Sequence, residues 1–428
     1  MDVRSGYKLT DAGVIPAEWA IEPFARLFTF SNGVNAAKES YGKGLRFVNV
    51  LEPITYSHLY GPEIPGRVAL PEVLAKAYAV EYGDVLFNRT SETEAELGLA
   101  TVFLGAEHVV FGGFVIRGRP TGDSLEPTYS GYALRAPFIR AQIVPLGQGA
   151  VRSNIGQRNL GLVVAPIPPK REQRAIAAAL SDVDALLGGL DRLIAKKRDL
   201  KRAAMQQLLT GQTRLPGFDG AWVPLNMAEK SSLHARIGWQ GLTTSEYLSN
   251  GQYFLVTGTD FESGRVTWST CCFVSEERYS QDRKIQLRQR DILVTKDGTI
   301  GKVGFVDRLP GAATLNSGVF VIRPKNDAYD PEFFYYVLTS SIFDTFMKKL
   351  RAGSTISHLY QKDFVSFSFL APPTVAEQSA IAAVLSEMHA EQSALEARRD
   401  KTRALKQGVM QELLTGRTRL VPAGAADA

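Results

Sequence analysis

The sequence has few cysteines and no long hydrophobic stretch. Cys271 and Cys272 are the two cysteines among 428 residues. Adjacent cysteines bridge each other only with strain, so we expect both thiols to be reduced. The uncharged stretch 364–376 is far shorter than the roughly 20 apolar residues that cross a bilayer, and the first ten residues lack an apolar run. We therefore predict a cytoplasmic protein without a membrane segment or a secretory signal.

Motifs of common catalytic sites are missing as well. Residues 298–302 resemble part of a phosphate loop, but Lys296 stands where its first Gly belongs and Val303 replaces the required Ser or Thr. The five histidines form no His-Glu-x-x-His motif, and the sequence has neither a Cys-x-x-Cys pair nor a Gly-x-Ser-x-Gly elbow. It also has no cofactor-binding Gly-x-Gly loop and no base-methylation motif. These absences predict a non-catalytic chain with no metal and no cofactor of its own.

Positive charge is concentrated in one segment. The net charge is +5, and residues 166–215 carry 10 Lys and Arg against 5 Asp and Glu, whereas residues 1–165 carry 15 against 16. Proteins that coat DNA without regard to sequence are basic throughout, because neutralising phosphates supplies most of their affinity. Any nucleic-acid binding by this chain is therefore expected to be local or helped by a partner.

The chain is an internal duplication. Two segments of about fifty residues share identities in register, as in Glu172-Gln173 and Glu377-Gln378, at an offset of 205 (377 − 172). The segments before them match more loosely, for example at Trp19 and Trp222. The order A–B–A′–B′ predicts domains at 1–165 and 216–370, helical segments at 166–215 and 371–420, and a flexible tail at 421–428.

Each helical segment carries the apolar spacing of a coiled coil. Prolines precede each helix, and Gly211 and Gly416 follow it. About forty residues at ~1.5 Å each make a rod of roughly 60 Å, and the natural partner for each rod is the other copy, packed antiparallel. The predicted interface residues alternate in steps of three and four: Ile176, Leu180, Val183, Leu187, Leu190 and Ile194 in the first helix, and Ile381, Leu385, Met388 and Leu395 in the second.

The segments before the helices predict a mixed α/β fold. Short runs rich in β-branched and aromatic residues are bounded by turn residues, which is typical of strands. The predicted strands are Phe47–Leu51, Asp84–Phe87, Ala100–Leu104 and Phe114–Arg117 in the first domain, and Tyr253–Thr257, Asp291–Thr295, Val303–Val306 and Gly318–Arg323 in the second. The loops between such strands offer a polar and aromatic surface for binding.

Taken together, the paired motifs resemble a known family. Pro-Pro…Glu-Gln-x-Ala-Ile opens each helix, and Leu-Lys…Met-Gln-x-Leu-Leu-Thr-Gly-x-Thr-Arg-Leu closes it. This plan is similar to that of the specificity subunit of type I restriction-modification systems, over essentially the whole chain. The resemblance implies two target recognition domains, related by a pseudo-twofold repeat and joined by two long antiparallel coiled-coil helices.

The resemblance also implies a function and partners. Each recognition domain would read one half of a bipartite double-stranded DNA target. The helices would set the spacing and dock two methyltransferase subunits, which bring S-adenosylmethionine and modify adenine. Motor-nuclease subunits would join in a restricting system.

The residues themselves leave two other hypotheses open. One is an enzyme with disguised motifs, and the other is a non-catalytic scaffold whose globular domains bind protein rather than DNA.

Candidate DNA-binding residues follow from the chemistry of base edges, which Arg, Lys, Asn and Gln read by paired hydrogen bonds. We select loop residues after the central strand and before the helix of each domain, with Asn32 and Asn316 as weaker candidates. The predicted set is Asn49, Arg89, Thr90, Arg152, Ser153 and Asn154 in the first domain, and Trp239, Gln240, Lys296, Asp297, Ser357 and His358 in the second. For each one the alternative is an ordinary loop side chain, and for Trp239 a core aromatic.

The basic run from Arg192 to Arg202 has two interpretations. It could line the path of DNA, or it could be the solvated or partner-facing side of a long helix. We favour the second, because Glu391 and Glu396 accompany the equivalent run in the other copy.

Overall fold

The structure is a computed structural model that describes residues 4–10, 13–149, 152–237, 241–352 and 358–422. The chain forms two compact units. Unit 1 comprises residues 1–191 and 398–428, and unit 2 comprises residues 192–397. Each unit therefore contains one globular α/β domain together with one end of each long helix.

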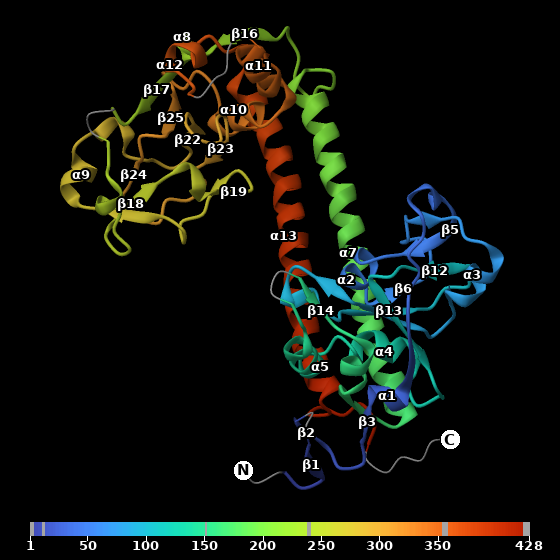
Figure 1. Cartoon of the computed structure of the whole chain (residues 1–428). Helices are drawn as coiled ribbons and strands as arrows, with labels where there is room; N and C mark the ends of the chain where they lie inside the picture. Colours follow the sequence, from blue (N-terminus) through green and yellow to red (C-terminus); the bar gives the residue numbers. More distant parts are fainter. Residues whose placement is uncertain (1–3, 11–12, 150–151, 238–240, 353–357, 423–428) are drawn as a thin grey trace. The chain divides into compact units, whose positions relative to one another are not determined.

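The two long helices have the predicted length and direction. Both have 40 residues: α7 is Lys170–Leu209 and α13 is Val375–Leu414. Within each unit they run antiparallel (Figure 1), as cross-helix pairs show: Lys406 to Asp184 (2.5 Å) in unit 1 and Lys197 to Glu391 (2.6 Å) in unit 2. Each helix ends two residues before a glycine with positive φ, +73° at Gly211 and +67° at Gly416, a conformation that favours glycine.

The predicted interface residues divide between cores and a half-buried middle. Ile176 and Leu180 join the core of unit 1 with Leu413 and Leu414, and Ile381 and Leu385 join the core of unit 2 with Leu208 and Leu209. Thus each helix end packs against the opposite end of the other helix as well as against a domain. Leu190 and Ile194 are also buried, whereas four members of the predicted set are only half-buried: Val183, Leu187, Met388 and Leu395.

Unit 1 contains two main sheets. One has the strand order β4-β13-β9-β11-β6, and its strands are β4 (Phe28–Asn32), β13 (Val115–Pro120), β9 (Val85–Asn88), β11 (Ala100–Phe103) and β6 (His58–Leu59). The other has the order β7-β5-β12-β8, and its strands are β7 (Arg67–Val68), β5 (Tyr41–Val48), β12 (Val109–Phe111) and β8 (Ala79–Val80). Helices α4 (Pro127–Ala133) and α5 (Pro137–Ile143) pack between the first sheet and α7, in one apolar core.

Unit 2 repeats this plan. Its larger sheet, β17-β25-β22-β23-β20-β19, contains β17 (Ser231–Ala235), β25 (Val319–Pro324), β22 (Ile292–Thr295), β23 (Val303–Phe305), β20 (Arg265–Val266) and β19 (Phe261–Glu262). Its smaller sheet, β21-β18-β24, contains β21 (Cys272–Val274), β18 (Tyr253–Val256) and β24 (Ala313–Leu315). Helices α10 (Pro331–Leu338) and α11 (Ser341–Ala352) pack beside α7 and α13. Cys271 and Cys272 are both free thiols.

Short pairings and helices complete both units. Two equivalent ribbons lead into the long helices, β3 (Ala20–Pro23) with β15 (Val164–Ile167) and β16 (Val223–Asn226) with β26 (Ser368–Ala371). A hairpin joins β1 (Tyr7–Thr10) and β2 (Gly13–Pro16). The remaining α-helices are α1 (Phe24–Leu27), α2 (Leu51–Thr55), α3 (Glu72–Ala77), α6 (Gln157–Gly161), α8 (Met227–Lys230), α9 (Glu276–Ser280) and α12 (Gln361–Phe364).

Two predictions about the strands are wrong in detail. The strand predicted at Phe47–Leu51 is β5, which ends at Val48, and Leu51 begins α2 because Glu52 accepts a hydrogen bond from the backbone of Asn49 (2.8 Å) and starts a helical turn. Arg323 corresponds to Arg119 rather than to Arg117. Arg119 binds Asp84 (2.8 and 3.0 Å), just as Arg323 binds Asp291 (2.6 Å), so the carboxylate sets the register of the repeat.

The repeated Glu-Gln pair explains why the helix ends are duplicated. In unit 2, Arg214 follows α7 and donates to Glu377 in the first turn of α13 (2.6 and 2.7 Å). In unit 1, Arg419 follows α13 and contacts Glu172 in the first turn of α7 (2.7 Å for Nη2 to Oε2). The end of each helix is therefore bonded to the start of the other.

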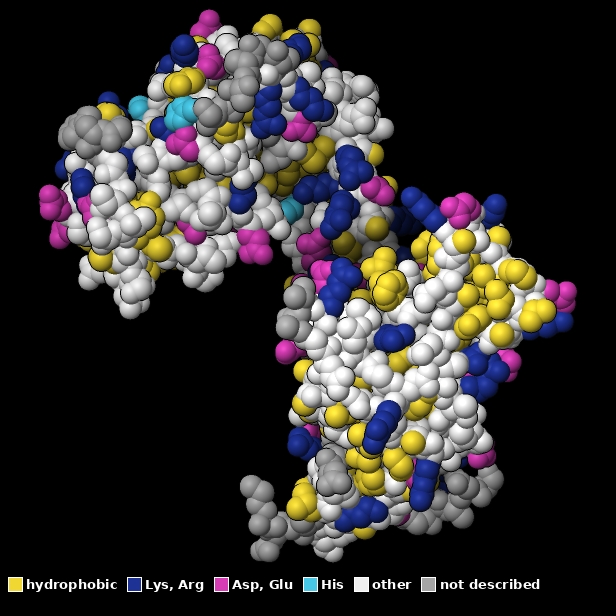
Figure 2. Space-filling model, in the orientation of Figure 1, with side chains coloured by type: hydrophobic (Ala, Val, Ile, Leu, Met, Phe, Trp, Pro, Cys, Tyr) yellow, Lys and Arg dark blue, Asp and Glu magenta, His cyan; other side chains and the backbone are white. Residues whose placement is uncertain are grey.

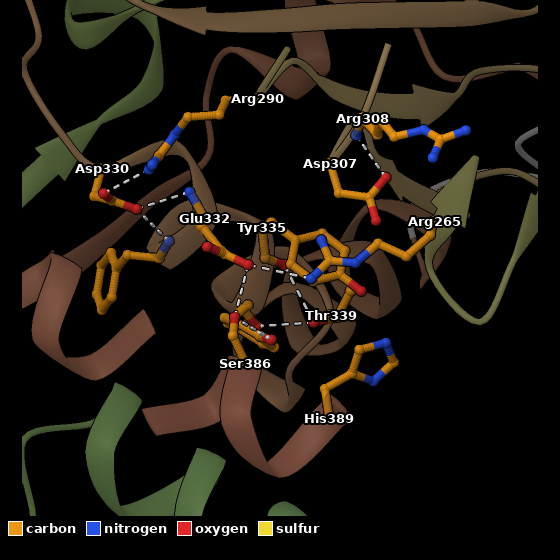
Figure 3. Close-up of polar contacts among 12 residues, drawn as sticks. Arg265, Arg290, Asp307, Arg308, Asp330, Glu332, Tyr335, Thr339, Ser386 and His389 are labelled. Atoms are coloured by element: carbon orange, nitrogen blue, oxygen red, sulfur yellow. Dashed lines mark hydrogen bonds and ion pairs between the residues drawn. The ribbon is translucent and has the colours of Figure 1, made fainter. Parts of the chain in front are cut away.

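The glutamines connect the helices to the domains. Gln173 accepts from the backbone N–H of Glu126 (2.8 Å), which begins α4, and Gln378 accepts from that of Asp330 (2.9 Å), which begins α10. Asp330 also binds Arg290 (2.7 Å) and caps α10 (Figure 3). Each glutamine thus fixes a domain to the start of its helix.

We predict a pH dependence of stability from His389 on α13. Burial, Lys201 and Arg265 lower its pKa to about 4 against the opposing Glu396 and Asp307, from an ordinary value of 6.5. Between these values the unfolded chain binds more protons than the folded chain, so the free energy of unfolding decreases as the pH falls through that window. Above about pH 6.5 this group contributes no pH dependence.

A comparison with His389→Gln tests this prediction. Urea unfolding of the full chain, followed at pH 7 and near pH 5, should show a smaller loss of stability in the variant than in the wild type. Identical losses in the two proteins would contradict the prediction.

Candidate nucleic-acid interface

Equivalent backbone hydrogen bonds hold two loops together at the same place in both units. In unit 1, Ile155 donates to the carbonyl of Arg89, just after β9 (3.0 Å). In unit 2, Leu359 donates to the carbonyl of Lys296, just after β22 (2.8 Å). The loop after the central strand is therefore fixed to the segment that leads towards the long helix.

The side chains on these loops pair at equivalent positions but differ in chemistry. In unit 1, β10 (Thr90–Ser91) pairs with β14 (Ser153–Asn154), and the Thr90 hydroxyl donates to Asn154 Oδ1 (2.7 Å). In unit 2 the corresponding side chains are Asp297 and His358, which form an ion-pair contact. The fold thus presents the same two positions twice, with neutral hydrogen-bonding groups in unit 1 and ionisable groups in unit 2.

A cavity of about 410 Å³ opens beside the loops of unit 1. Three predicted residues line it, Asn49, Thr90 and Arg152. The carboxamide oxygen of Asn49 is buried and has no hydrogen-bond partner among the described residues. A buried acceptor left unpaired is costly, so it is suited to receive a hydrogen bond from a ligand. Asparagine is one of the residues that read adenine.

The apolar wall of this cavity was missed from the sequence. Leu51, Ile54 and Phe114 line it, and Leu51 and Phe114 are 67% and 52% exposed. Phe114 directly precedes β13, and its position in the predicted strand hid its exposure. An apolar surface beside polar groups suits contact with a base, which presents both hydrogen-bonding edges and, in thymine, a methyl group.

The arginines of unit 1 are held by neighbours. Arg152 forms an ion pair with Glu92 (2.7 Å), and both side chains are more than half exposed, so the pair is weak and open to exchange with a ligand. Arg89 donates to the carbonyl of Gly113 (3.3 Å). The glutamates near Arg89 therefore do not neutralise it through a direct pair, since Glu92 binds Arg152 and Glu96 accepts from Ser91 (2.8 Å).

Unit 2 presents fewer of its predicted residues. Lys296, Asp297 and His358 lie together, with the Lys296 ammonium 5.6 Å from the ring of Phe320. Asn316 is engaged internally, because it donates to the Tyr247 hydroxyl and accepts from the backbone of Gly318 (2.8 Å). Asn32 is exposed at the end of β4. The predicted residues Trp239, Gln240 and Ser357 lie outside the described residues.

The charged surface is dispersed. Figure 2 shows Lys and Arg spread among uncharged and apolar side chains over the face that it draws. In the described part of the chain, no cluster of three or more His, Cys, Asp or Glu side chains could hold a metal ion. Its helices include none with the length and apolar character needed to cross a membrane.

Comparison with known proteins places this arrangement in context. Residues 241–403 match the family model of the type I restriction modification DNA specificity domain. The "Putative type I restriction enzyme MjaX specificity subunit" of Methanocaldococcus jannaschii is 23% identical over 428 residues, covering 97% of each chain. The MjaVIII specificity subunit from the same organism is 24% identical over 313 residues, 70% of this chain and 71% of that one.

Two solved structures share the fold. The S subunit of a type I restriction-modification system from M. genitalium superposes with a TM-score of 0.60 at 16% identity, over 96% of this chain and 98% of that one. A chain from a study of complex assembly in the type I system superposes with a TM-score of 0.57 at 17% identity, over 94% and 99%. The duplicated fold with two long helices is therefore the fold of these subunits.

Proposed function

The chain belongs to the family of type I restriction-modification specificity subunits, and from this premise we propose that each of its units reads one half of a bipartite double-stranded DNA target. The chain is a non-catalytic subunit. Its contribution is sequence choice, while the chemistry is carried out by its partners.

One observation carries this proposal. The two units hold their loops with equivalent backbone bonds, at Arg89 and at Lys296, yet present different side chains from them. Hydrogen bonds to base edges depend on the identity and placement of such side chains. A constant frame with exchanged side chains is what reading two different half-sites requires.

The partners follow from the same family. Two methyltransferase subunits would dock on the helix pair, one for each copy of the repeat, and each would bring S-adenosylmethionine to modify an adenine. In a restricting system, motor-nuclease subunits would complete the complex. The duplicated Arg214–Glu377 and Arg419–Glu172 pairs support this arrangement, because they build two related ends on one helix pair.

A genome-wide map of methyladenine tests the proposal. Cells that express the chain with its methyltransferase should show a split motif, two short half-sites around an unspecified gap. The motif should vanish when the gene for this chain is deleted and the methyltransferase is kept. An unchanged map, despite a complex that can be purified, would contradict the proposal.

A further inference from the structure

A cavity of about 480 Å³ lies in unit 2 beside the helix pair. Three cations of α7 line it, Arg198, Lys201 and Arg202, against one carboxylate, Asp344. Its apolar part includes Met205. The cavity lies away from the candidate reading loops: α11 lines it with its first turn, whereas Arg351 near the other end of α11 reaches the carbonyl of Ile300 (3.3 Å).

The same location in unit 1 also holds a cavity, of about 800 Å³. Its residues Arg403, Lys406, Met410 and Gln411 are the equivalents, at the offset of 205, of residues that line the cavity in unit 2. The repeat therefore offers an internal comparison of two cavities built from the same helical motif.

The central lysine differs between the two cavities. In unit 1, Lys406 donates to the carboxylate of Asp184 (2.5 Å) and lies over the ring of Tyr132. In unit 2, Lys201 lies over the equivalent Tyr336, but the position of Asp184 is taken by His389, whose Nδ1 is 3.0 Å from the lysine nitrogen. One cavity thus supplies its own counter-charge and the other supplies a neutral ring.

The histidine cannot neutralise Lys201. An ammonium only donates hydrogen bonds, so Nδ1 of His389 accepts, and the lowered pKa keeps the ring neutral at ordinary pH. The nearby Glu396 attracts Lys201 but is bound by Arg198 (3.2 Å) and Gln392 (3.0 Å).

Other positive charge surrounds the pair. Figure 3 shows His389 below Arg265, which pairs with Glu332 (3.2 Å). Burial and Arg265 lower the pKa of Lys201, so a half-buried ammonium here would gain from an added anion.

We propose that the unit 2 cavity receives an acidic side chain of a partner protein, so that the two ends of the helix pair are unequal docking sites. The inference rests on the proposed function, in which the partner is the methyltransferase subunit. An apolar floor under a charged rim favours a protein over DNA, because protein interfaces bury an apolar core whereas DNA interfaces are more polar and wetter.

Exchanging the two symmetry-related residues tests the inference. His389→Asp gives Lys201 the internal carboxylate that Lys406 has, so binding of one of two methyltransferase subunits to the full chain should weaken about tenfold or more. Lys201→Ala should have a similar effect. The matched control, Asp184→His in unit 1, should not weaken binding. Native mass spectrometry and calorimetry with the purified methyltransferase subunit report stoichiometry and affinity.

A cross-linking measurement on the wild-type complex needs no substitution. A carbodiimide joins a lysine amine to a neighbouring carboxylate as an amide and takes up the water released. Lys406 should link to Asp184 within the chain, as an internal control, and Lys201 should link to an Asp or Glu of the methyltransferase subunit.

The outcomes separate the two levels of inference. A wild-type chain that binds no methyltransferase subunit contradicts the proposed function. Two bound subunits with affinities unchanged in His389→Asp and Lys201→Ala overturn the docking inference alone. A loss of DNA affinity in Lys201→Ala, with subunit binding intact, would identify a phosphate site and would also overturn it.

Discussion

Replacing Glu377 with alanine is expected to lower the free energy of unfolding of unit 2 by about 3–5 kcal/mol, the usual cost of removing one partner of a buried ion pair. The Glu377 side chain is 1% exposed and receives both hydrogen bonds of the Arg214 fork, at 2.6 and 2.7 Å. Its loss would leave the guanidinium partly buried without a counter-charge. Because Arg214 is 26% exposed, water compensates in part, and we expect the lower end of the range.

Urea unfolding followed with a probe in unit 2 measures this effect. Glu391→Ala is the control, because Glu391 pairs with Lys197 on the same helices (2.6 Å) but is 50% exposed, so its loss should cost less than about 1 kcal/mol. Glu172→Ala repeats the experiment in unit 1, where it removes the partner of Arg419 and of the Trp19 indole (2.9 Å). Equal effects of Glu377→Ala and Glu391→Ala would contradict the importance of the buried pair.

Replacing both Thr90 and Asn154 with alanine is expected to relax one half of the DNA target and to leave the other half intact. These side chains form the exchanged pair of unit 1. A well-placed contact to a base edge discriminates by about 1–3 kcal/mol, so selectivity at the affected base pairs should fall about five- to 150-fold. The fold should persist, because the bond that holds the loop is made by the backbone of Arg89.

The methyladenine map of cells that express this variant measures the change. The matched variant with Asp297→Ala and His358→Ala should relax the opposite half, because these residues occupy the equivalent positions of unit 2. The pair of variants would also assign each half-site to its domain. Relaxation of both halves by either variant, or of neither half by both, would contradict the assignment of these loops to base reading.

The sequence was sufficient for the elements that depend on local pattern. The two 40-residue helices follow from apolar spacing and from glycines beyond their ends, and the central strands β9 and β22 follow from short β-branched runs. The predicted register failed at Arg117, because neighbouring arginines look alike in a sequence. Only the contact with Asp84 distinguishes Arg119 as the equivalent of Arg323.

By itself, then, the sequence determined the duplication, the helices, the mixed α/β domains and the family, because repeated motifs and periodic apolar residues are local properties of the chain. The tertiary structure decided which distant residues meet. It brought Asn49, Thr90 and Arg152 to one cavity and paired Asp297 with His358, 61 residues away. It also turned the exchange of Asp184 for His389 into a difference in charge, because that difference exists only where the opposite helix places Lys406 or Lys201 beside it.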